Sequence, residues 1–324
     1  MTWLVTGGAG YIGAHVARML SDDGRSVIIL DDLSTGLRNR LPVGMPLVLG
    51  SVLDRDLLDR IFTDYSIDGI LHLAGKRDPA ESYADPLCYY QQNLNGLQTL
   101  LKSALEARVR KLVFSSSAAV YGEPDLEFVG ENTPCAPLSP YGMTKLAGER
   151  LVEYLGNSRG LEYVNLRFFG VAGALAPELG DVGSGNLVQA TLDRLTSGRA
   201  PVLYGRDYPT HDGTCIRDFI HVADVASAHV AAVRRLEQQP GTGLVLNIGR
   251  GTGVSVKEMV DTIQDTIGRS AEPMVMPRRP GDPAQIVACA DRIRAELGWE
   301  SRYDLADIVN SAWDAWRGRN GERS

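Results

Sequence analysis

The stretch Thr6-Gly7-Gly8-Ala9-Gly10-Tyr11-Ile12-Gly13 decides the fold of this 324-residue chain. It follows a β-branched run at Thr2–Thr6 and opens a helical pattern at Tyr11–Asp23. Its glycines 7, 10 and 13 lie where the backbone of a strand-to-helix turn approaches a pyrophosphate. A glycine triplet also fits a tight turn without a ligand. The strand before it and the helix after it favour a dinucleotide site.

The first half of the chain alternates short strands with longer amphipathic helices. This βαβ alternation requires a parallel sheet with helices on both faces. The predicted fold class is therefore α/β, a Rossmann-type doubly wound parallel sheet with a smaller, mostly C-terminal α/β substrate domain. The expected strands are Thr2–Thr6, Ser26–Leu30, Pro46–Leu49, Gly69–Leu73, Lys111–Ser116 and Leu161–Arg167, and the expected helices are Tyr11–Asp23, Asp54–Asp64, Pro86–Ala107 and Pro140–Asn157.

The regular alternation weakens after Arg167. A Gly-rich loop is expected over Gly170–Gly185, and the tail Arg317–Ser324 is expected to fray. A later α/β alternation indicates that part of this half returns to the first sheet. We therefore expect a dinucleotide-binding domain over residues 1–168, with return segments near 217–248, and a substrate domain over 169–324. The later elements are expected at Asn186–Thr196, Pro201–Tyr204, Phe219–Val222, Ala223–Leu236, Leu244–Ile248 and Val256–Ile267.

The charge balance argues against polyanionic partners. The chain has 33 basic and 40 acidic residues and a net charge of -7, the wrong sign for a protein that grips nucleic acid or an anionic membrane. The longest stretch without charged residues, Met1–Ala17, is interrupted by four glycines and follows no basic segment. We expect no membrane span, no signal peptide and a small-molecule partner.

Cysteine and histidine spacing gives no metal site. The cysteines form no CxxC pair and the histidines no HExxH motif, so we expect no metal and interpret the cysteines as reduced thiols of a cytoplasmic protein. His72 and His221 stand in apolar runs and are interpreted as core or strand-end residues. The cysteines are Cys88, Cys135, Cys215 and Cys289.

The second strand ends in Asp31-Asp32, about where an acidic residue binds the adenosine ribose in dinucleotide folds. A carboxylate there repels a 2′-phosphate. NAD is therefore favoured over NADP, although Arg38 leaves NADP open as the alternative.

A candidate base lies at the start of the helix Pro140–Asn157. Tyr141 and Lys145 are four residues apart and share one helix face. A phenol with a pKa of about 10 is a poor base at neutral pH, but a nearby ammonium and a positive nicotinamide ring both favour phenolate. Twelve tyrosines make a chance Tyr-to-Lys spacing common, so its position after the fifth strand carries the argument.

The fifth strand runs into Ser115-Ser116-Ser117-Ala118-Ala119-Val120-Tyr121-Gly122. Ligands of α/β sheets bind at the carboxyl ends of strands, where Ser117 is expected to hydrogen-bond a reacting hydroxyl. Serines also serve as caps and turn residues without any chemistry. No Asp or Glu follows the serines, so we do not expect a dehydration.

The sequence resembles the extended short-chain dehydrogenase/reductase superfamily through TGGAGYIG, Asp31–Ser34, SSSAAVYG and SPYGMTK. Within it, Tyr204–Val222 resembles the signature of UDP-glucose 4-epimerases. Nearly the whole chain is covered. Further matching positions are Glu81-Ser82 with Pro86, Tyr89 and Asn93, and the run Pro277–Asp282.

The resemblance implies roles for individual residues. Tyr141 would be the acid/base on the sugar 4-hydroxyl, with Lys145 tuning it and Ser117 assisting. NAD would be bound by Gly7, Gly10, Tyr11, Ile12, Gly13, Asp31, Asp32, Leu33, Ser34, Ser51, Val52, Leu73, Ala74, Gly75, Arg77, Asn93, Ser115, Tyr141, Lys145 and Phe169. The UDP-hexose would be bound by Ser117, Tyr141, Gly170, Asn186, Leu187, Val202, Leu203, Tyr204, Arg217, Arg279, Asp282 and Ile286.

The implied activity is NAD-dependent epimerisation at C4 of a nucleotide hexose, interconverting UDP-glucose and UDP-galactose in a cytoplasmic homodimer. The alternatives are a 4-epimerase or decarboxylase of a UDP-uronic acid, an epimerase of another nucleotide sugar, and a non-catalytic NAD sensor. The chain departs from the family pattern at Arg77, Ser51, Ala119, Gly170 and Phe219.

Overall fold

The computed structural model describes residues 1–183, 185–279 and 281–321. The chain forms two compact units, each built from several segments. The first unit comprises Met1–Val120, Pro137–Arg167 and Ala226–Leu246, and the second comprises Tyr121–Ala136, Phe168–Val225 and Asn247–Ser324.

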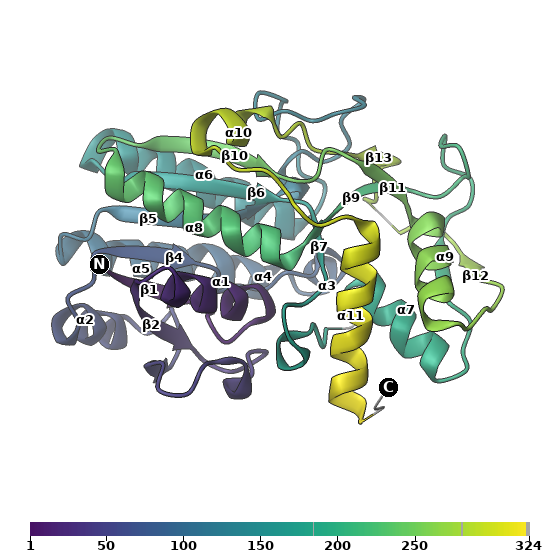
Figure 1. Ribbon diagram of the computed structural model, residues 1–324. Helices are drawn as coiled ribbons and strands as arrows, with labels where there is room; N and C mark the ends of the chain where they lie inside the picture. The colour runs from purple at the N-terminus through teal and green to yellow at the C-terminus, as the bar shows by residue number, and fades with distance from the viewer. Residues whose placement is uncertain (184, 280, 322–324) are drawn as a thin grey trace. The chain divides into compact units, whose positions relative to one another are not determined.

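The first unit is organised around a seven-stranded sheet (Figure 1). The strand order in the described residues is β10-β6-β5-β4-β1-β2-β3, and β1 pairs in parallel with both β2 and β4. The order therefore reverses direction between β1 and β4, which is where doubly wound sheets bind ligands. The strands are β1 Thr2–Thr6, β2 Ser26–Asp31, β3 Leu47–Leu49, β4 Gly69–His72, β5 Lys111–Ser117, β6 Glu162–Phe168 and β10 Gly243–Ile248.

Helices separate these strands along the chain, as the sequence predicts. The segment Pro86–Ala107, expected as one helix, is α4, then a π-helical stretch at Tyr90–Asn95, then α5. The capping residues explain two starts: Ser139 accepts from the amide of Gly142 before α6, and Asp54 accepts from the amide of Leu57 before α2. The helices are α1 Tyr11–Asp22, α2 Arg55–Asp64, α3 Pro79–Ala84, α4 Pro86–Tyr89, α5 Gly96–Glu106, α6 Pro140–Arg159 and α8 Val222–Gln238.

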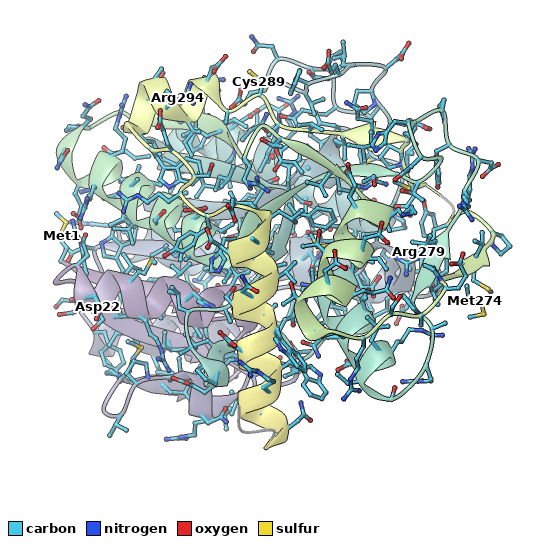
Figure 2. The ribbon with its side chains drawn as sticks, turned by 45° about the vertical axis from the view of Figure 1, so that its right-hand side comes forward. Met1, Asp22, Met274, Arg279, Cys289 and Arg294 are labelled. Atoms are coloured by element: carbon cyan, nitrogen blue, oxygen red, sulfur yellow. The ribbon has the colours of Figure 1, made fainter. Side chains whose placement is uncertain are left out.

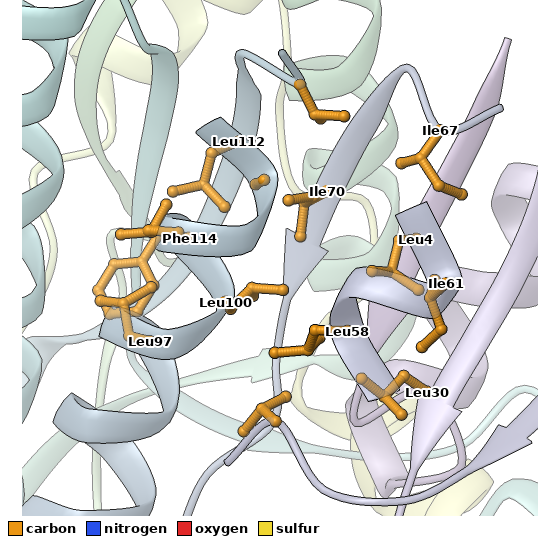
Figure 3. Packing of buried hydrophobic residues seen from close by; sticks show 14 of the residues in the cluster. Leu4, Leu30, Leu58, Ile61, Ile67, Ile70, Leu97, Leu100, Leu112 and Phe114 are labelled. Atoms are coloured by element: carbon orange, nitrogen blue, oxygen red, sulfur yellow. The ribbon is translucent and has the colours of Figure 1, made fainter. Parts of the chain in front are cut away.

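Apolar side chains of α2 and α5 pack on one face of this sheet (Figure 3). Leu58 of α2 and Leu100 of α5 are fully buried against strand residues such as Leu4 and Ile70. Fully burying one such side chain stabilises the fold by about 1.5–3 kcal/mol, so this cluster fixes the helices that precede and follow β4.

The second unit contains a smaller sheet, β11-β9-β13, with β7 also paired to β9, and a two-stranded pair, β12-β8. Its core includes Leu192, Met259, Ile263 and Ile308. The elements are β7 Gly170–Ala172, α7 Leu187–Thr196, β8 Val202–Tyr204, β9 Ile216–His221, β11 Gly253–Ser255, α9 Val256–Ile267, β12 Met274–Met276, β13 Gln285–Ile286, α10 Asp291–Leu297 and α11 Leu305–Asn320.

Two further sequence expectations, a loop and a frayed tail, are wrong. The expected loop Gly170–Gly185 begins with strand β7, because Gly170 pairs with Phe219 of β9. The expected frayed tail is helical to Asn320, because a capping box starts α11 and Trp316 packs into the core; residues 322–324 lie outside the described part.

The later alternation returns to the first sheet through β10, whereas the strand expected at Phe219–Val222 is β9 of the second unit. In the described part of the chain, no helix is long and apolar enough to cross a membrane.

Candidate active site

The glycine turn after β1 is closely packed against the end of β4. Gly7 has φ of 71°, and a Cβ there would lie 2.7 Å from the amide nitrogen of Ala74. A Cβ on Gly13 would lie 2.1 Å from the carbonyl oxygen of Gly7. Both positions therefore require glycine, and the turn draws the loops after β1 and β4 together.

Gly10 is the N-cap of α1 and differs from these two positions. Its Cβ would meet only the Gly7 carbonyl oxygen, at 3.1 Å, so the space beyond it is open. The cap has no side chain to engage the first turn of α1, and that turn contains no acidic residue. An open, uncapped helix start next to backbone amides fits a pyrophosphate, so the residues present suit a dinucleotide.

Asp31 ends β2 and is buried. Its Oδ2 accepts a hydrogen bond from the amide of Ala9 at 2.9 Å, and its Oδ1 accepts from that of Leu33 at 2.9 Å. Burial raises the pKa of Asp31, and the two amides act in the opposite direction. Each carboxylate oxygen keeps a second lone pair for a ribose hydroxyl. Leu33 itself has φ of 58°, a strained conformation of the kind that gathers at ligand sites.

Asn93 organises the loop after β4. It lies in the π-helical stretch, and its Oδ1 accepts from the amide of Lys76 at 2.7 Å. Its Nδ2 donates to the carbonyl of Lys76 and to the Thr144 hydroxyl of α6. The structure thus places Asn93 where it orders the loop Gly75–Lys76 and joins it to α6.

Tyr141, Lys145 and Ser117 lie together in the first unit. The hydroxyl of Ser117, at the end of β5, hydrogen-bonds the buried phenol of Tyr141. The ammonium of Lys145 lies 5.9 Å from the centre of the Tyr141 ring and donates to the carbonyl of Ser115 at 2.8 Å. Serine and lysine therefore both approach the tyrosine, as a proton-transfer site requires.

The charges at this site are set by burial. Burial raises the pKa of Tyr141, while the Ser117 hydrogen bond and then the positive charge of Arg77 lower it. Burial lowers the pKa of Lys145 to about 8, and the carboxylate of Glu149 opposes that shift. Arg77 is thus a further cation near the phenol beside Lys145, and its guanidinium lies 5.9 Å from the centre of the Tyr11 ring. The sequence predicts only Lys145 in this role.

The sequence reasoning missed several buried groups beside this site. Glu149 forms an ion pair with Arg167 of β6, and Ser115 shares a hydrogen bond with His229 of α8 at 3.1 Å. The signal for Glu149 was available, because it follows Lys145 by the same four residues that separate Lys145 from Tyr141. Arg167 and His229 carry no comparable signal.

Two arginines predicted to bind the nucleotide, Arg217 and Arg279, each make a contact within the second unit. The guanidinium of Arg279 lies 3.9 Å from the centre of the Tyr204 ring. Nη2 of Arg217 lies 3.4 Å from Oδ1 of Asp282, and Arg217 is the register partner of Ile286. Figure 2 shows Arg279 on the segment after β12, in the same part of the molecule as Met274. An arginine pair of this kind suits a diphosphate.

The remaining predicted residues have mainly structural contacts. Asn186 caps α7 and also donates to Asp181 and to the Val171 carbonyl, while Leu187 begins that helix. Val202 and Leu203 belong to β8, and Gly170 begins β7. The amide of Phe169 donates to Ile248. Ser51 accepts from the amide of Leu53, Ser34 donates to Asp32, and Val52 packs in the core cluster of the first unit.

The chain is similar to known proteins over nearly its whole length. The model of the NAD dependent epimerase/dehydratase family matches residues 3–249. A UDP-glucose 4-epimerase of Azospirillum brasilense is 44% identical over 316 residues, which are 95% of this chain and 90% of that protein. One of Streptomyces lividans is 42% identical over 318 residues, 96% of this chain and 95% of that protein.

Solved structures of UDP-glucose 4-epimerases are also similar to this chain over nearly its whole length. A UDP-glucose 4-epimerase of Stenotrophomonas maltophila, with bound NAD and formylated UDP-arabinopyranose, has a TM-score of 0.94 at 37% identity and covers 99% of both chains. The enzyme of Bifidobacterium longum, in complex with NAD+ and UDP, has a TM-score of 0.92 at 34% identity, again covering 99% of both chains.

Proposed function

We propose that this chain, which belongs to the UDP-glucose 4-epimerases of the NAD dependent epimerase/dehydratase family, interconverts UDP-glucose and UDP-galactose. The observation that carries the proposal is the phenol of Tyr141, buried, hydrogen-bonded by Ser117 and followed one turn later by Lys145. This arrangement moves a proton to and from a sugar hydroxyl.

Tyr141 takes the proton from O4 of the hexose and returns it at the end of the cycle. Its phenol has to be ionised for the first step, and burial opposes that ionisation. The Ser117 hydroxyl and the charge of Arg77 favour the phenolate. Lys145, held by the Ser115 carbonyl, keeps a second positive charge in the same buried place.

When bound, NAD would supply the hydride acceptor and donor for C4, with a 4-keto sugar between the two transfers and no net redox change. The glycine turn, Asp31 and the loop after β4 are the residues that would hold it. Because each catalytic cycle regenerates NAD, the reaction does not require the cofactor to dissociate. We therefore expect NAD to remain bound during purification.

Residues of the second unit would hold the UDP group. Arg217 and Arg279 supply two cations for the diphosphate, and Tyr204 supplies an aromatic face. In the structure, Arg217 contacts Asp282 and Arg279 lies over the ring of Tyr204, and these contacts order the two arginine side chains. In this proposal the arginines give up part of these contacts when they bind the phosphates.

The same proposal includes a homodimer built on the helical segments Pro86–Ala107 and Pro140–Asn157 of the first unit. Leu87 of α4 is 81% exposed, and Met143 and Tyr154 of α6 are 42% and 69% exposed. Where such side chains form one contiguous patch, they mark a partner surface. Light scattering of the purified protein tests this, with a monomer as the contradicting result. A cytoplasmic location stays a prediction.

The activity is tested by incubating purified protein with UDP-glucose, UDP-galactose and UDP-glucuronic acid without added NAD. We expect the two hexoses to interconvert and the uronic acid to be unchanged. Denaturing the same sample should release NAD or NADH. Conversion of the uronic acid alone, or release of NADP alone, would contradict the proposal.

A further inference from the structure

Three consecutive residues at the end of β5, Ser115–Ser117, contact three positions of α6. Those positions, Tyr141, Lys145 and Glu149, are spaced four apart and so share one helix face. The third of them has no part in the proton transfer described above. The contacts are Ser117 with the Tyr141 phenol, the Ser115 carbonyl with the Lys145 ammonium, and the Ser116 hydroxyl with Oε1 of Glu149.

Glu149 is held in a buried, bidentate ion pair. Its Oε1 accepts from Nε of Arg167 at 2.9 Å, and its Oε2 accepts from Nη2 at 2.6 Å. The two side chains are 1% and 4% exposed. Removing two charges from water costs several kcal/mol each, so a buried pair contributes little net stability compared with apolar residues. Stability alone therefore does not explain this pair.

Glu149 is the carboxylate whose charge acts on Lys145, and it shares that charge with Arg167. His72 of β4 is buried, and its pKa is lowered to about 3, so it is neutral. Arg167 of β6 is positive but paired with Glu149, and His229 of α8 contacts Ser115. Burial lowers the pKa of Lys145 to about 8, and the carboxylate of Glu149 opposes that shift.

We propose that Glu149 is a positioning residue for the reaction: held by Arg167 and Ser116 one helical turn after Lys145, it keeps the Lys145 ammonium charged beside Tyr141. The proposal rests on the proposed function, because it needs Lys145 to act as a cation beside the phenol. Glu149 touches neither substrate nor cofactor in this scheme and acts only through Lys145.

The test compares Glu149→Gln with wild type, both as purified with their bound nucleotide. The measurements are kcat and KM for UDP-galactose from pH 6.5 to 10, with nucleotide content and Tm. We expect the alkaline limb of kcat to move to lower pH by about one unit, a tenfold change in the protonated fraction of Lys145 on that limb. KM should change little.

Glu237→Gln is the matched control. Glu237 also accepts hydrogen bonds from an arginine and a second donor, Arg25 and Trp3, in the same unit. This variant should lower Tm and leave the alkaline limb in place. A merely structural role of Glu149 predicts the same behaviour for Glu149→Gln.

Glu149→Gln leaves Arg167 buried without its partner, which can prevent folding. Glu149→Asp and the double variant Glu149→Gln/Arg167→Met keep the proposal testable. The limb should return toward the wild-type pH with Asp and stay displaced in the double variant. If the wild type is active and every folded variant has the same alkaline limb as the wild type, this proposal alone is overturned. If the wild type converts no UDP-galactose, the proposed function is contradicted and this proposal with it.

Discussion

The ammonium of Lys145 donates a hydrogen bond to the carbonyl oxygen of Ser115 at 2.8 Å, and both groups are buried. A backbone carbonyl at the end of a central strand thus fixes where the positive charge lies. The strand end that presents Ser117 to Tyr141 therefore also locates the lysine.

Lys145→Ala should lower kcat at pH 7.5 by about a hundredfold or more, since acid–base groups contribute about 10²–10⁴. Without the ammonium only Ser117 and Arg77 favour the phenolate against burial, so activity should recover partly as pH rises. Some NAD should also be lost on purification. Steady-state kinetics and analysis of the bound nucleotide check this. Unchanged turnover at pH 7.5 would show that Lys145 takes no part in the reaction.

Asp31→Asn should weaken NAD retention and lower the stability. Each carboxylate oxygen accepts one backbone amide, from Ala9 and from Leu33, and an asparagine replaces only one of them. The unpaired amide costs about 1–3 kcal/mol. Asp54→Asn is the control, because Asp54 lies outside the predicted cofactor residues and a single oxygen, Oδ1, accepts the backbone amide of Leu57. Equal Tm and equal nucleotide content in the two variants would argue against this role.

His72→Gln should make stability less dependent on pH in mild acid. The folded state holds His72 neutral, with its pKa lowered from 6.5 to about 3 by burial and by Lys145, whereas the unfolded chain protonates it below 6.5. Stability is therefore lost as pH falls from about 6.5 toward 3. The fall in Tm from pH 7 to 5 should be smaller in this variant. A fall in Tm as large as that of the wild type would contradict this role of His72.

Ile286→Ala should raise the use of N-acetylated UDP-hexoses relative to the plain hexoses. Ile286 is the register partner of Arg217 on β9, and Arg217 is the residue proposed to meet the diphosphate. The family resemblance implies that Ile286 lies beside the sugar, where a branched side chain would narrow the space for a 2-substituent. Specificity constants for UDP-N-acetylglucosamine and UDP-glucose check this, and a wild type that uses both equally would contradict it.

The sequence predicts the first unit far better than the second. Strands β1 to β6 and helices α1, α2 and α6 lie within two residues of their expected bounds, because glycine turns and short β-branched runs mark them locally. The π-helical stretch at Tyr90–Asn95 has no local signal. Strand β7 was missed because three residues pair only through the distant β9.

The candidate site, too, could be predicted from the sequence only in part. The spacing of Tyr141 and Lys145 could be read directly from the chain, and the same spacing extends to Glu149. That Asn93 orders the loop Gly75–Lys76, and that Arg167 pairs with Glu149, depends on packing between distant segments. No local pattern carries that information.

The most direct test of the proposed mechanism is the turnover of UDP-galactose by the variant Tyr141→Phe. The substitution removes one oxygen and keeps the buried ring, which packs edge to face with Tyr89 at 6.4 Å, so fold and bound cofactor should remain. We predict a loss of about 10²–10⁴ in kcat with little change in KM, because the phenol acts in the transition state. If the folded, nucleotide-containing variant turns over UDP-galactose at near the wild-type rate, Tyr141 is not the acid/base and the proposed mechanism is wrong.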